Sequence, residues 1–339
     1  MKRNYNLELL RILAMIMIIT LHYMTFGIEI RQSSSLAYHN NYYWFIYALC
    51  HGAVNLFVLL TGYFQIKSTF KWKKVYKLWL QVFFYSLLFG ILLSILGYYK
   101  LHIIDILHIL FPIISKSWWF ISTYIILYIL SPFFNKFLLN LNQKEYKYLL
   151  LIIVICVILN NIIPGSYFID NYHGYNILWF LCIYTVGAYI RLYDIKKVNT
   201  YLYLIVYLIC SLITVLSRFI LLNYLHKYIN YFDGGNYLYA YNSLTIFIGS
   251  VALFMFFKNI KIKPIFYKLV TTLSSTTFGV YLIHEHFLIR PLLWNDIIKI
   301  NMYYNDHKYL FLVTSVLSIF IICSFIEYLR MLVFKKLKV

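Results

Sequence analysis

Residues 7–26 read LELLRILAMIMIITLHYMTF, an apolar stretch that carries an arginine, Arg11, and, eleven positions later, a histidine, His22. Eleven steps of about 100° bring an α-helix back to within roughly 20° of the same face, and a rise of about 1.5 Å per residue separates the two side chains by ~16 Å. Ionisable side chains inside a membrane helix are costly and mark functional sites. We therefore expect one helix face with Arg11 near one end and His22 near the other. Glu8 lies three positions before Arg11, so the two can pair on that helix.

The composition is that of an integral membrane protein. The chain of 339 residues is 63% hydrophobic and 12% charged, and its mean hydropathy is +0.74. The apolar runs are long enough to cross about 30 Å of hydrocarbon as helices. The formal net charge of +19 does not indicate a nucleic-acid-binding protein. The basic residues fall in short loops between apolar runs, where they set orientation and meet anionic lipid headgroups.

The pattern predicts an all-α bundle of about ten transmembrane helices. The expected spans are 7–26, 43–64, 76–98, 118–135, 148–163, 176–190, 201–223, 241–257, 270–290 and 309–333. The short apolar segment 101–114 is expected to be interfacial or re-entrant. We see no internal repeat and no linker, so we expect one membrane domain over residues 1–339, without a fused soluble extracellular domain.

Loop charges predict the orientation of these spans. With the amino terminus inside, the expected cytoplasmic segments hold 21 of the 30 Lys and Arg residues and the expected external segments hold seven. Arg11 and Arg218 lie within spans. An excess of cations on the cytoplasmic side is typical of multi-pass membrane proteins. We therefore expect both termini in the cytoplasm and the chain in the cell membrane.

Two further groups of residues could carry chemistry. Residues 67–79, KSTFKWKKVYKLW, hold five lysines beside the third expected span. They could bind phosphates or form an ordinary positive loop. The late span carries His284, Glu285 and His286. We expect no metal site there, because residues two positions apart point away from each other on a helix. The five cysteines lie in apolar segments without a C-x-x-C pair, which favours small buried side chains over disulfides.

Arg11 and His22 also have ordinary interpretations, since an arginine can extend to the lipid headgroups and an interfacial histidine can bond a carbonyl group. Because the two residues are expected on one helix face, a functional role is favoured over these ordinary interpretations.

The order of these motifs resembles the acyltransferase-3 family of membrane-bound acyltransferases, which includes many bacterial glycan O-acetyltransferases. The resemblance covers residue 4 to about residue 335. It is carried by Leu7–Arg11 followed by His22, by Phe57–Phe64, by Trp119-Phe120, by Tyr128–Pro132 and by Gly279–His284. The family often has an R-x-x-R pair, implicated in coenzyme A binding, after the second span. Its nearest equivalent here is Lys74 and Lys77, which keep the charge but lack the bidentate fork of arginine.

The resemblance implies transfer of an acyl group, preferably acetyl, from cytoplasmic acetyl-coenzyme A to a hydroxyl of a cell-surface or lipid-linked glycan. No permanently bound cofactor is implied, and the bilayer expected is the bacterial cytoplasmic membrane. His22 is then the catalytic residue, either as a general base or as a carrier of the acetyl group. The expected donor-binding residues are Arg11, Lys74 and Lys77, with Glu8 orienting Arg11, and the expected acceptor-side residues are Trp119, His284 and Glu285.

Two other functions fit the sequence. A transporter or flippase of a lipid-linked sugar should show paired repeats and spans broken by glycine or proline. This chain has 12 Gly and 5 Pro and no repeat that we detect. The chain could also move acetyl groups across the membrane and pass them to a separate extracellular transferase or to glycan-assembly proteins.

Overall fold

The computed structural model describes residues 3–35, 37–115, 118–162, 173–193, 198–225, 227, 235–299 and 307–337, and over these residues the chain is helical without a strand. This confirms the all-α class. The longer helices are α1 (Tyr5–His22), α2 (Asn41–His51), α3 (Ala53–Gln65), α4 (Trp72–Ile95), α5 (Ile103–Leu110), α6 (Trp119–Asn140), α7 (Gln143–Ile162), α8 (Ile177–Leu192), α9 (Thr200–Asn223), α10 (Leu244–Asn259), α11 (Tyr267–His284) and α14 (Lys308–Lys336). Short turns are η1 (Tyr23–Gly27), η3 (Pro264–Phe266), α12 (Ile289–Leu292) and η4 (Leu293–Ile297).

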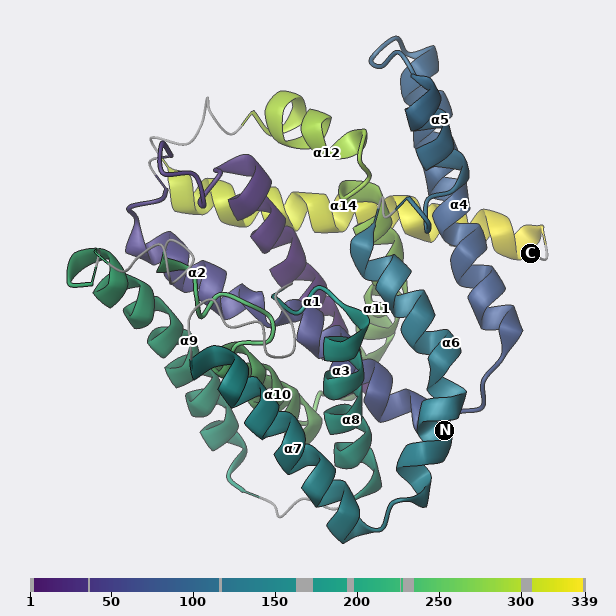
Figure 1. Ribbon diagram of the computed structural model, residues 1–339. Helices are drawn as coiled ribbons and strands as arrows, with labels where there is room; N and C mark the ends of the chain where they lie inside the picture. Colours follow the sequence, from purple (N-terminus) through teal and green to yellow (C-terminus); the bar gives the residue numbers. More distant parts are fainter. Residues whose placement is uncertain are drawn as a thin grey trace.

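Within the residues that the structure describes, each expected span contains a helix or a pair of consecutive helices, and six of these are long and apolar enough to cross a membrane alone. The number is up to seven if α10 and α11, which are bent by 113° at their junction, form one span. The protein is thus a multi-pass helical membrane protein, while ten spans and cytoplasmic termini stay predictions. The segment 101–114 forms the short helix α5 against α4, where the Ser86 hydroxyl donates to the Ile109 carbonyl at 2.9 Å (Figure 1).

Helix α1 is central to the bundle (Figure 1) and contacts α2, α3, α10, α11 and α14. Its side chains are apolar on nearly every side, so that Leu7, Leu10 and Ile19 are fully buried. A helix that is apolar all round is typical of a protein interior. Arg11 and His22 therefore belong to a helix inside the bundle, and their side chains are only partly exposed, at 30% and 18%. Just after His22 the chain makes one wider turn, η1, in which Ile28 N donates to the Tyr23 carbonyl at 3.0 Å.

Helices α1 and α11 run side by side in register. Each has 18 residues, and each ends at a histidine, His22 and His284. At their first residues the rings of Tyr5 and Tyr267 stack with centroids 3.7 Å apart and an angle of 6°. At their last residues His22 and His284 are in contact. The register thus brings two histidines that are 262 positions apart in sequence to the same level.

A buried polar network fixes α11 against α4 and α14. Glu327 of α14 is 1% exposed, and it accepts hydrogen bonds from Tyr85 Oη at 2.7 Å, from Gln81 Nε2 at 3.0 Å and from Arg330 Nε and Nη2 at 2.8 and 2.7 Å. A Cβ atom on Gly279 of α11 would overlap the carboxylate of Glu327. This carboxylate therefore joins α4, α11 and α14 only because residue 279 has no side chain.

Helices α3 and α8 also approach closely through glycines. A Cβ atom on Gly62 would overlap the Tyr184 carbonyl, and one on Gly187 would overlap the Leu59 carbonyl. Small residues at helix contacts allow backbones to approach within a membrane bundle. The close contact holds α3 in place, and other residues of α3 face the cavity described below.

Replacing Gly62 with Ala should destabilise the folded protein by about 1–3 kcal/mol, as overpacking of a tight contact does. The matched control is Gly249→Ala in α10, where the new Cβ would meet its nearest atom, Cys210 Cβ, at an ordinary 3.5 Å. Thermal unfolding of the detergent-solubilised protein measures both variants. Equal melting temperatures for the two variants would contradict the close packing of α3 on α8.

The predicted orientation can be tested with single cysteines at two exposed positions, Ser33 and Thr69. The five native cysteines are buried or half-buried, so they should react little. An impermeant maleimide should label Ser33→Cys on intact cells and Thr69→Cys only after permeabilisation, because the loop around Thr69 holds many lysines. Labelling of both positions from one side would show that the predicted topology is wrong.

Candidate active site

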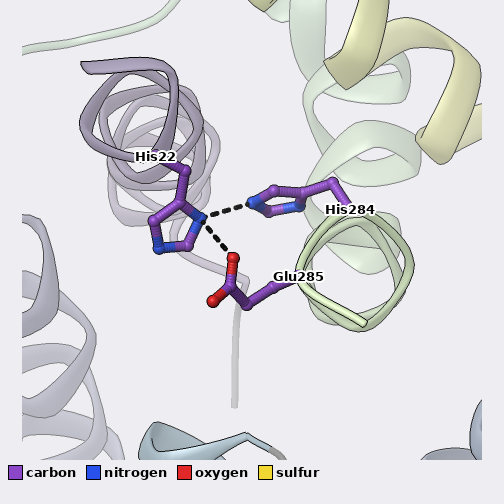
Figure 2. A group of neighbouring side chains, drawn as sticks. All are labelled: His22, His284 and Glu285. Atoms are coloured by element: carbon purple, nitrogen blue, oxygen red, sulfur yellow. Dashed lines mark hydrogen bonds and ion pairs between the residues drawn. The ribbon is translucent and has the colours of Figure 1, made fainter. Parts of the chain in front are cut away.

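The candidate site lies where the ends of α1 and α11 meet (Figure 2). His22 Nδ1 is 3.0 Å from His284 Nε2 and 3.1 Å from Glu285 Oε2. Glu285, the first residue after α11, pairs through its other oxygen with Arg290 Nη1 at 2.8 Å. His284 is fully buried, and the side chain of His22 is 18% exposed. Two of the expected acceptor-side residues, His284 and Glu285, are thus direct neighbours of the expected catalytic residue.

The hydrogen bonds assign the protons in this cluster. His284 Nδ1 lies 2.6 Å from the Val280 carbonyl, which can only accept, so this nitrogen carries a proton. We assign neutral His284, whose Nε2 accepts, and His22 with its proton on Nδ1, where His284 Nε2 and the Glu285 carboxylate both face it. The second nitrogen, His22 Nε2, points away from both partners in Figure 2. It makes no hydrogen bond to a described residue and is not buried.

This arrangement suits a general base or a nucleophile. The hydrogen bond from Nδ1–H to His284 Nε2 holds His22 in one tautomer, and a carboxylate 3.1 Å from Nδ1 stabilises the imidazolium that forms when Nε2 takes a proton. Glu285 is in position for that role, and Arg290 fixes the carboxylate from its far side. The guanidinium of Arg290 lies 4.3 Å from the Phe26 ring centroid, in the turn that follows His22.

His22, His284 and Glu285 could also hold a metal ion, because one ligand atom of each lies within 4.8 Å of the others. The expectation of no metal site considered only His284 and His286. Those two do lie apart, since His286 Nδ1 accepts from Leu288 N at 3.2 Å and its ring contacts Phe89 and Trp118. In the cluster itself, a metal would need the same lone pair of His284 Nε2 that now accepts from His22. A metal ion would therefore compete with the His22 Nδ1 proton for this lone pair.

A cavity of about 350 Å³ leads from Arg11 toward this cluster. Its inner end reaches Ile18, Phe120 and Tyr281. Ile18 is one helical turn before His22, and the ring centroids of His22 and Tyr281 are 6.4 Å apart. The lining residues are Arg11, Met15, Ile18, Phe57, Leu60, Thr61, Phe64, Gln65, Leu78, Phe120, Ile121, Tyr124, Ser274, Ser275, Thr277, Phe278 and Tyr281. The cavity thus follows the helix face that Arg11 and His22 were expected to share.

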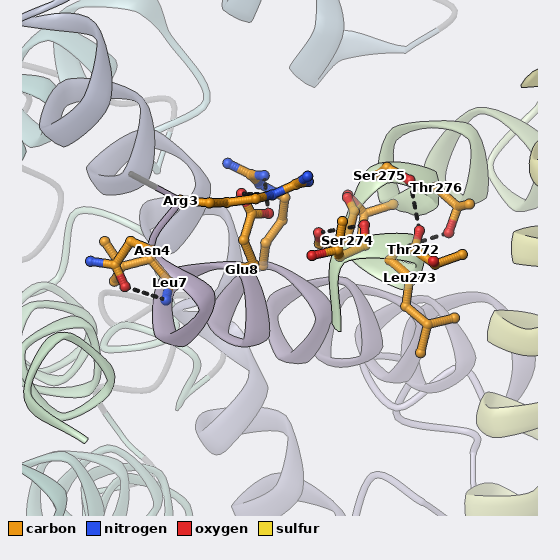
Figure 3. A network of polar contacts seen from close by, with 12 residues as sticks. Arg3, Asn4, Leu7, Glu8, Thr272, Leu273, Ser274, Ser275 and Thr276 are labelled. Atoms are coloured by element: carbon orange, nitrogen blue, oxygen red, sulfur yellow. Dashed lines mark hydrogen bonds and ion pairs between the residues drawn. The ribbon is translucent and has the colours of Figure 1, made fainter. Parts of the chain in front are cut away.

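At the Arg11 end of this cavity, the Glu8 carboxylate forms ion pairs with two arginines. This carboxylate lies 2.6 Å from Arg11 Nη1 and 3.7 Å from Arg3 Nε. Figure 3 shows Arg3 and Glu8 beside the hydroxyl-rich part of α11, with Ser274 on the side nearer to them, while the Ser275 hydroxyl donates to the Thr272 carbonyl at 2.7 Å. The Arg11 side chain is 30% exposed, so its charge remains accessible to an anion. The pairing of Glu8 with Arg11 is the one that their spacing predicts.

Lys74 and Lys77 are exposed in the first turns of α4, and the next residue, Leu78, lines the cavity. Lys74 Nζ lies 5.9 Å from the Tyr128 ring centroid. Both lysines are therefore close to the cavity in sequence without forming its wall. Trp119, the third expected acceptor-side residue, is not part of the His22 cluster. It is linked to that cluster through Phe120, whose ring centroid lies 5.9 Å from that of Tyr281.

The sequence did not identify several residues that shape the site. Arg290 follows the end of α11, so no helical spacing relates it to Glu285. Gln65 lines the cavity with a buried amide nitrogen that has no hydrogen-bond partner among the residues that the structure describes. The Ser and Thr side chains at 274, 275 and 277 give the cavity a polar wall opposite α3. The run TTLSSTT at 271–277 is visible in the sequence, and it is the one signal that could have marked this wall.

These features define a multi-pass membrane protein with a buried histidine–carboxylate site at the end of a cavity. The family model of the acyltransferase-3 domain, described as an acyltransferase domain, matches residues 4–328. The chain belongs to this family, and it is a membrane acyltransferase. No curated protein and no solved structure matches the chain significantly.

Replacing His22 with Ala should abolish acyl transfer, because no other described side chain can accept a proton at the position of His22 Nε2. Glu285→Gln should lower kcat by roughly 10²-fold or more and change KM little, because the carboxylate acts on the charged form of His22. Steady-state kinetics of the purified variants measure both effects. The matched control is His307→Ala, at an exposed histidine before α14. Near-normal turnover by well-folded His22→Ala would exclude His22 as the catalytic residue.

Proposed function

We propose that this protein transfers an acetyl group from cytoplasmic acetyl-coenzyme A to a hydroxyl of a cell-surface or lipid-linked glycan in the bacterial cytoplasmic membrane. The observation that carries the proposal is the cavity between Arg11 and Tyr281, which ends about one helical turn from His22. A donor that enters at Arg11 would place its far end beside a histidine whose Nε2 is accessible.

Coenzyme A suits the two ends of this cavity. Its phosphates are anionic, and Arg11, Lys74 and Lys77 supply cations at the entrance. Its pantetheine arm is long and narrow, comparable to the ~16 Å that separates Arg11 from His22 along α1. Walls such as Met15, Leu60 and Phe278 are apolar, while Ser274 and Thr277 could bond the amides of the arm. The nucleotide would then remain outside the hydrocarbon while the thioester reaches His22.

His22 can act in two ways on this thioester. As a general base, Nε2 takes the proton of the acceptor hydroxyl while the oxygen of that hydroxyl attacks the thioester carbonyl. The C–S bond then breaks, and the proton passes from Nε2 to the departing sulfur.

As a nucleophile, Nε2 itself attacks the carbonyl and releases the coenzyme A thiolate. The acetyl group then passes from the imidazole to the sugar oxygen, and the hydroxyl proton leaves with the thiolate. Glu285 stabilises the positive imidazole in both routes.

Arg11→Ala should raise KM for acetyl-coenzyme A by about tenfold or more, because it removes the cation that lines the cavity entrance, and Arg11→Lys should recover part of the loss. The pair Lys74→Ala and Lys77→Ala should raise KM less, because Lys71 and Lys73 remain nearby. The assay measures transfer and hydrolysis of radiolabelled acetyl-coenzyme A by the purified protein in liposomes.

The matched control for the lysine pair is Lys144→Ala with Lys147→Ala, two exposed lysines at the start of α7. An unchanged KM for acetyl-coenzyme A in Arg11→Ala would show that the donor does not bind at this cavity. If the wild-type protein neither transfers nor hydrolyses the acetyl group of acetyl-coenzyme A, the proposed donor is wrong.

A further inference from the structure

An aromatic cluster lies where α6, α8 and α10 begin, and we call Trp119, Tyr175 and Tyr241 the aromatic platform. The ring centroids of Trp119 and Tyr175 are 4.5 Å apart, those of Tyr175 and Tyr241 are 4.8 Å apart, and those of Trp119 and Tyr241 are 6.0 Å apart. Tyr175 is 44% exposed, Trp119 is half-buried and Tyr241 is buried. Tyr175 is thus accessible and Trp119 partly so, and both rings lie against the buried ring of Tyr241.

The buried side of the platform is built to keep these rings in place. His51 stacks on Tyr241 with ring centroids 4.9 Å apart. The Tyr241 carbonyl accepts a hydrogen bond from Asn55 Nδ2 at 2.8 Å, and Asn55 Oδ1 accepts one from Trp179 Nε1 at 3.0 Å. Helices α2, α3 and α8 therefore all fix the position of Tyr241. Such rigid aromatic surfaces bind flat apolar faces at little cost in conformational entropy.

A cation stands beside this platform. The exposed Arg31 guanidinium lies 5.6 Å from the Tyr47 ring centroid. The Tyr47 ring lies 5.1 Å from that of His51, which stacks on Tyr241 of the platform. Of the seven arginines, Arg3, Arg11, Arg290 and Arg330 each pair with a carboxylate. Arg31 pairs with no carboxylate in the part of the chain that the structure describes. Its charge is therefore available to an anion from outside the protein.

The platform and Arg31 border the His22 cluster. Tyr47 Oη lies 3.5 Å from Thr25 Oγ1, which is three residues after His22. Trp119 is followed by Phe120, which lies at the inner end of the donor cavity. A molecule on the platform would therefore lie next to residues that border both His22 and the donor cavity.

We propose that the acceptor is an anionic glycan, with one sugar ring on Trp119 and Tyr175 and a carboxylate or phosphate group bound by Arg31. This inference rests on the proposed transfer to a sugar hydroxyl. The C–H face of a sugar ring packs on aromatic side chains, and the arginine fork matches the oxygens of a carboxylate or a phosphate. Binding of that anion would place a neighbouring hydroxyl near His22 Nε2.

The test uses membranes from cells that lack their own copy of the protein and that express the wild type or a variant. Radiolabelled acetyl-coenzyme A is added, the glycans are released from their lipid carriers with mild acid, and the released glycans are separated by anion exchange. We expect the acetyl label in the retained, anionic fraction. Arg31→Gln should lower this incorporation at least tenfold, and Arg31→Lys should lower it less. The matched control is Lys308→Gln, which should incorporate as the wild type does, because Lys308 also lies over a tyrosine ring, 5.5 Å from the Tyr309 centroid, but is not part of the platform.

Chemical treatment of the glycans before the assay distinguishes the two anions. Reduction of carboxyl groups to alcohols should abolish incorporation if the group is a carboxylate, and removal of phosphate should abolish it if the group is a phosphate. Label in the unretained, neutral fraction, or wild-type incorporation by Arg31→Gln, would overturn the inference. Absence of label from every glycan fraction of wild-type membranes would instead overturn the proposed function, and the inference with it.

Discussion

The site depends on the register of α1 against α11. Stacked Tyr5 and Tyr267 fix the first residues of the two helices, and the hydrogen bond between His22 and His284 joins their last residues. Two helices of 18 residues each that match at both ends cannot slide by a turn without losing both contacts. A shift by one turn would move His22 by about 5.4 Å, far beyond a hydrogen bond. Their pairing thus sets both the geometry of the His22 cluster and the length of the cavity between the helices.

The chain balances most of its buried charge locally. Glu8 pairs with Arg11, Glu285 with Arg290, and Glu327 with Arg330, so each of these carboxylates has an arginine close behind it in sequence. Two of the pairs span one helical turn and the third crosses the end of α11. Buried ions are tolerated when they are paired and hydrogen-bonded. Each pair also has a second place in the structure: at the cavity entrance, beside His22, and at the junction of α4, α11 and α14.

Local features of this site were predictable from the sequence, and contacts between distant segments were not. The helix over residues 7–26, the shared face of Arg11 and His22, and the pairing of Glu8 with Arg11 all follow from helical periodicity. His284 and Glu285 were visible as ionisable residues in an apolar span. Their contact with His22 joins residues more than 260 positions apart, and one sequence carries no signal for such a pair. Arg290 lies past a helix end, where periodicity gives no spacing.

The fold shows the same division between local and distant information. Apolar runs located the helices, because length and hydropathy decide which segments form them. The close approach of α3 and α8 depends on what Gly62 and Gly187 face, which sequence position alone does not reveal. The bend of 113° between α10 and α11 is also a tertiary feature, and it decides whether these helices count as one span or two.

The proposed reaction places a new charge in a site that is already neutral. Glu285 and Arg290 cancel one another, so a proton on His22 Nε2 would leave the cluster with one net positive charge in surroundings of low dielectric constant. Such a cation is costly to keep, although the Glu285 oxygen 3.1 Å away reduces the cost while the charge lasts. The arrangement therefore favours rapid return of the proton to the departing sulfur over a long-lived imidazolium. An acyl-imidazole is cationic for the same reason, and its cost would drive the acetyl group onward to the acceptor. In either route the neutral pair of Glu285 and Arg290 makes the charged form of His22 a transient one, and this is what turnover requires.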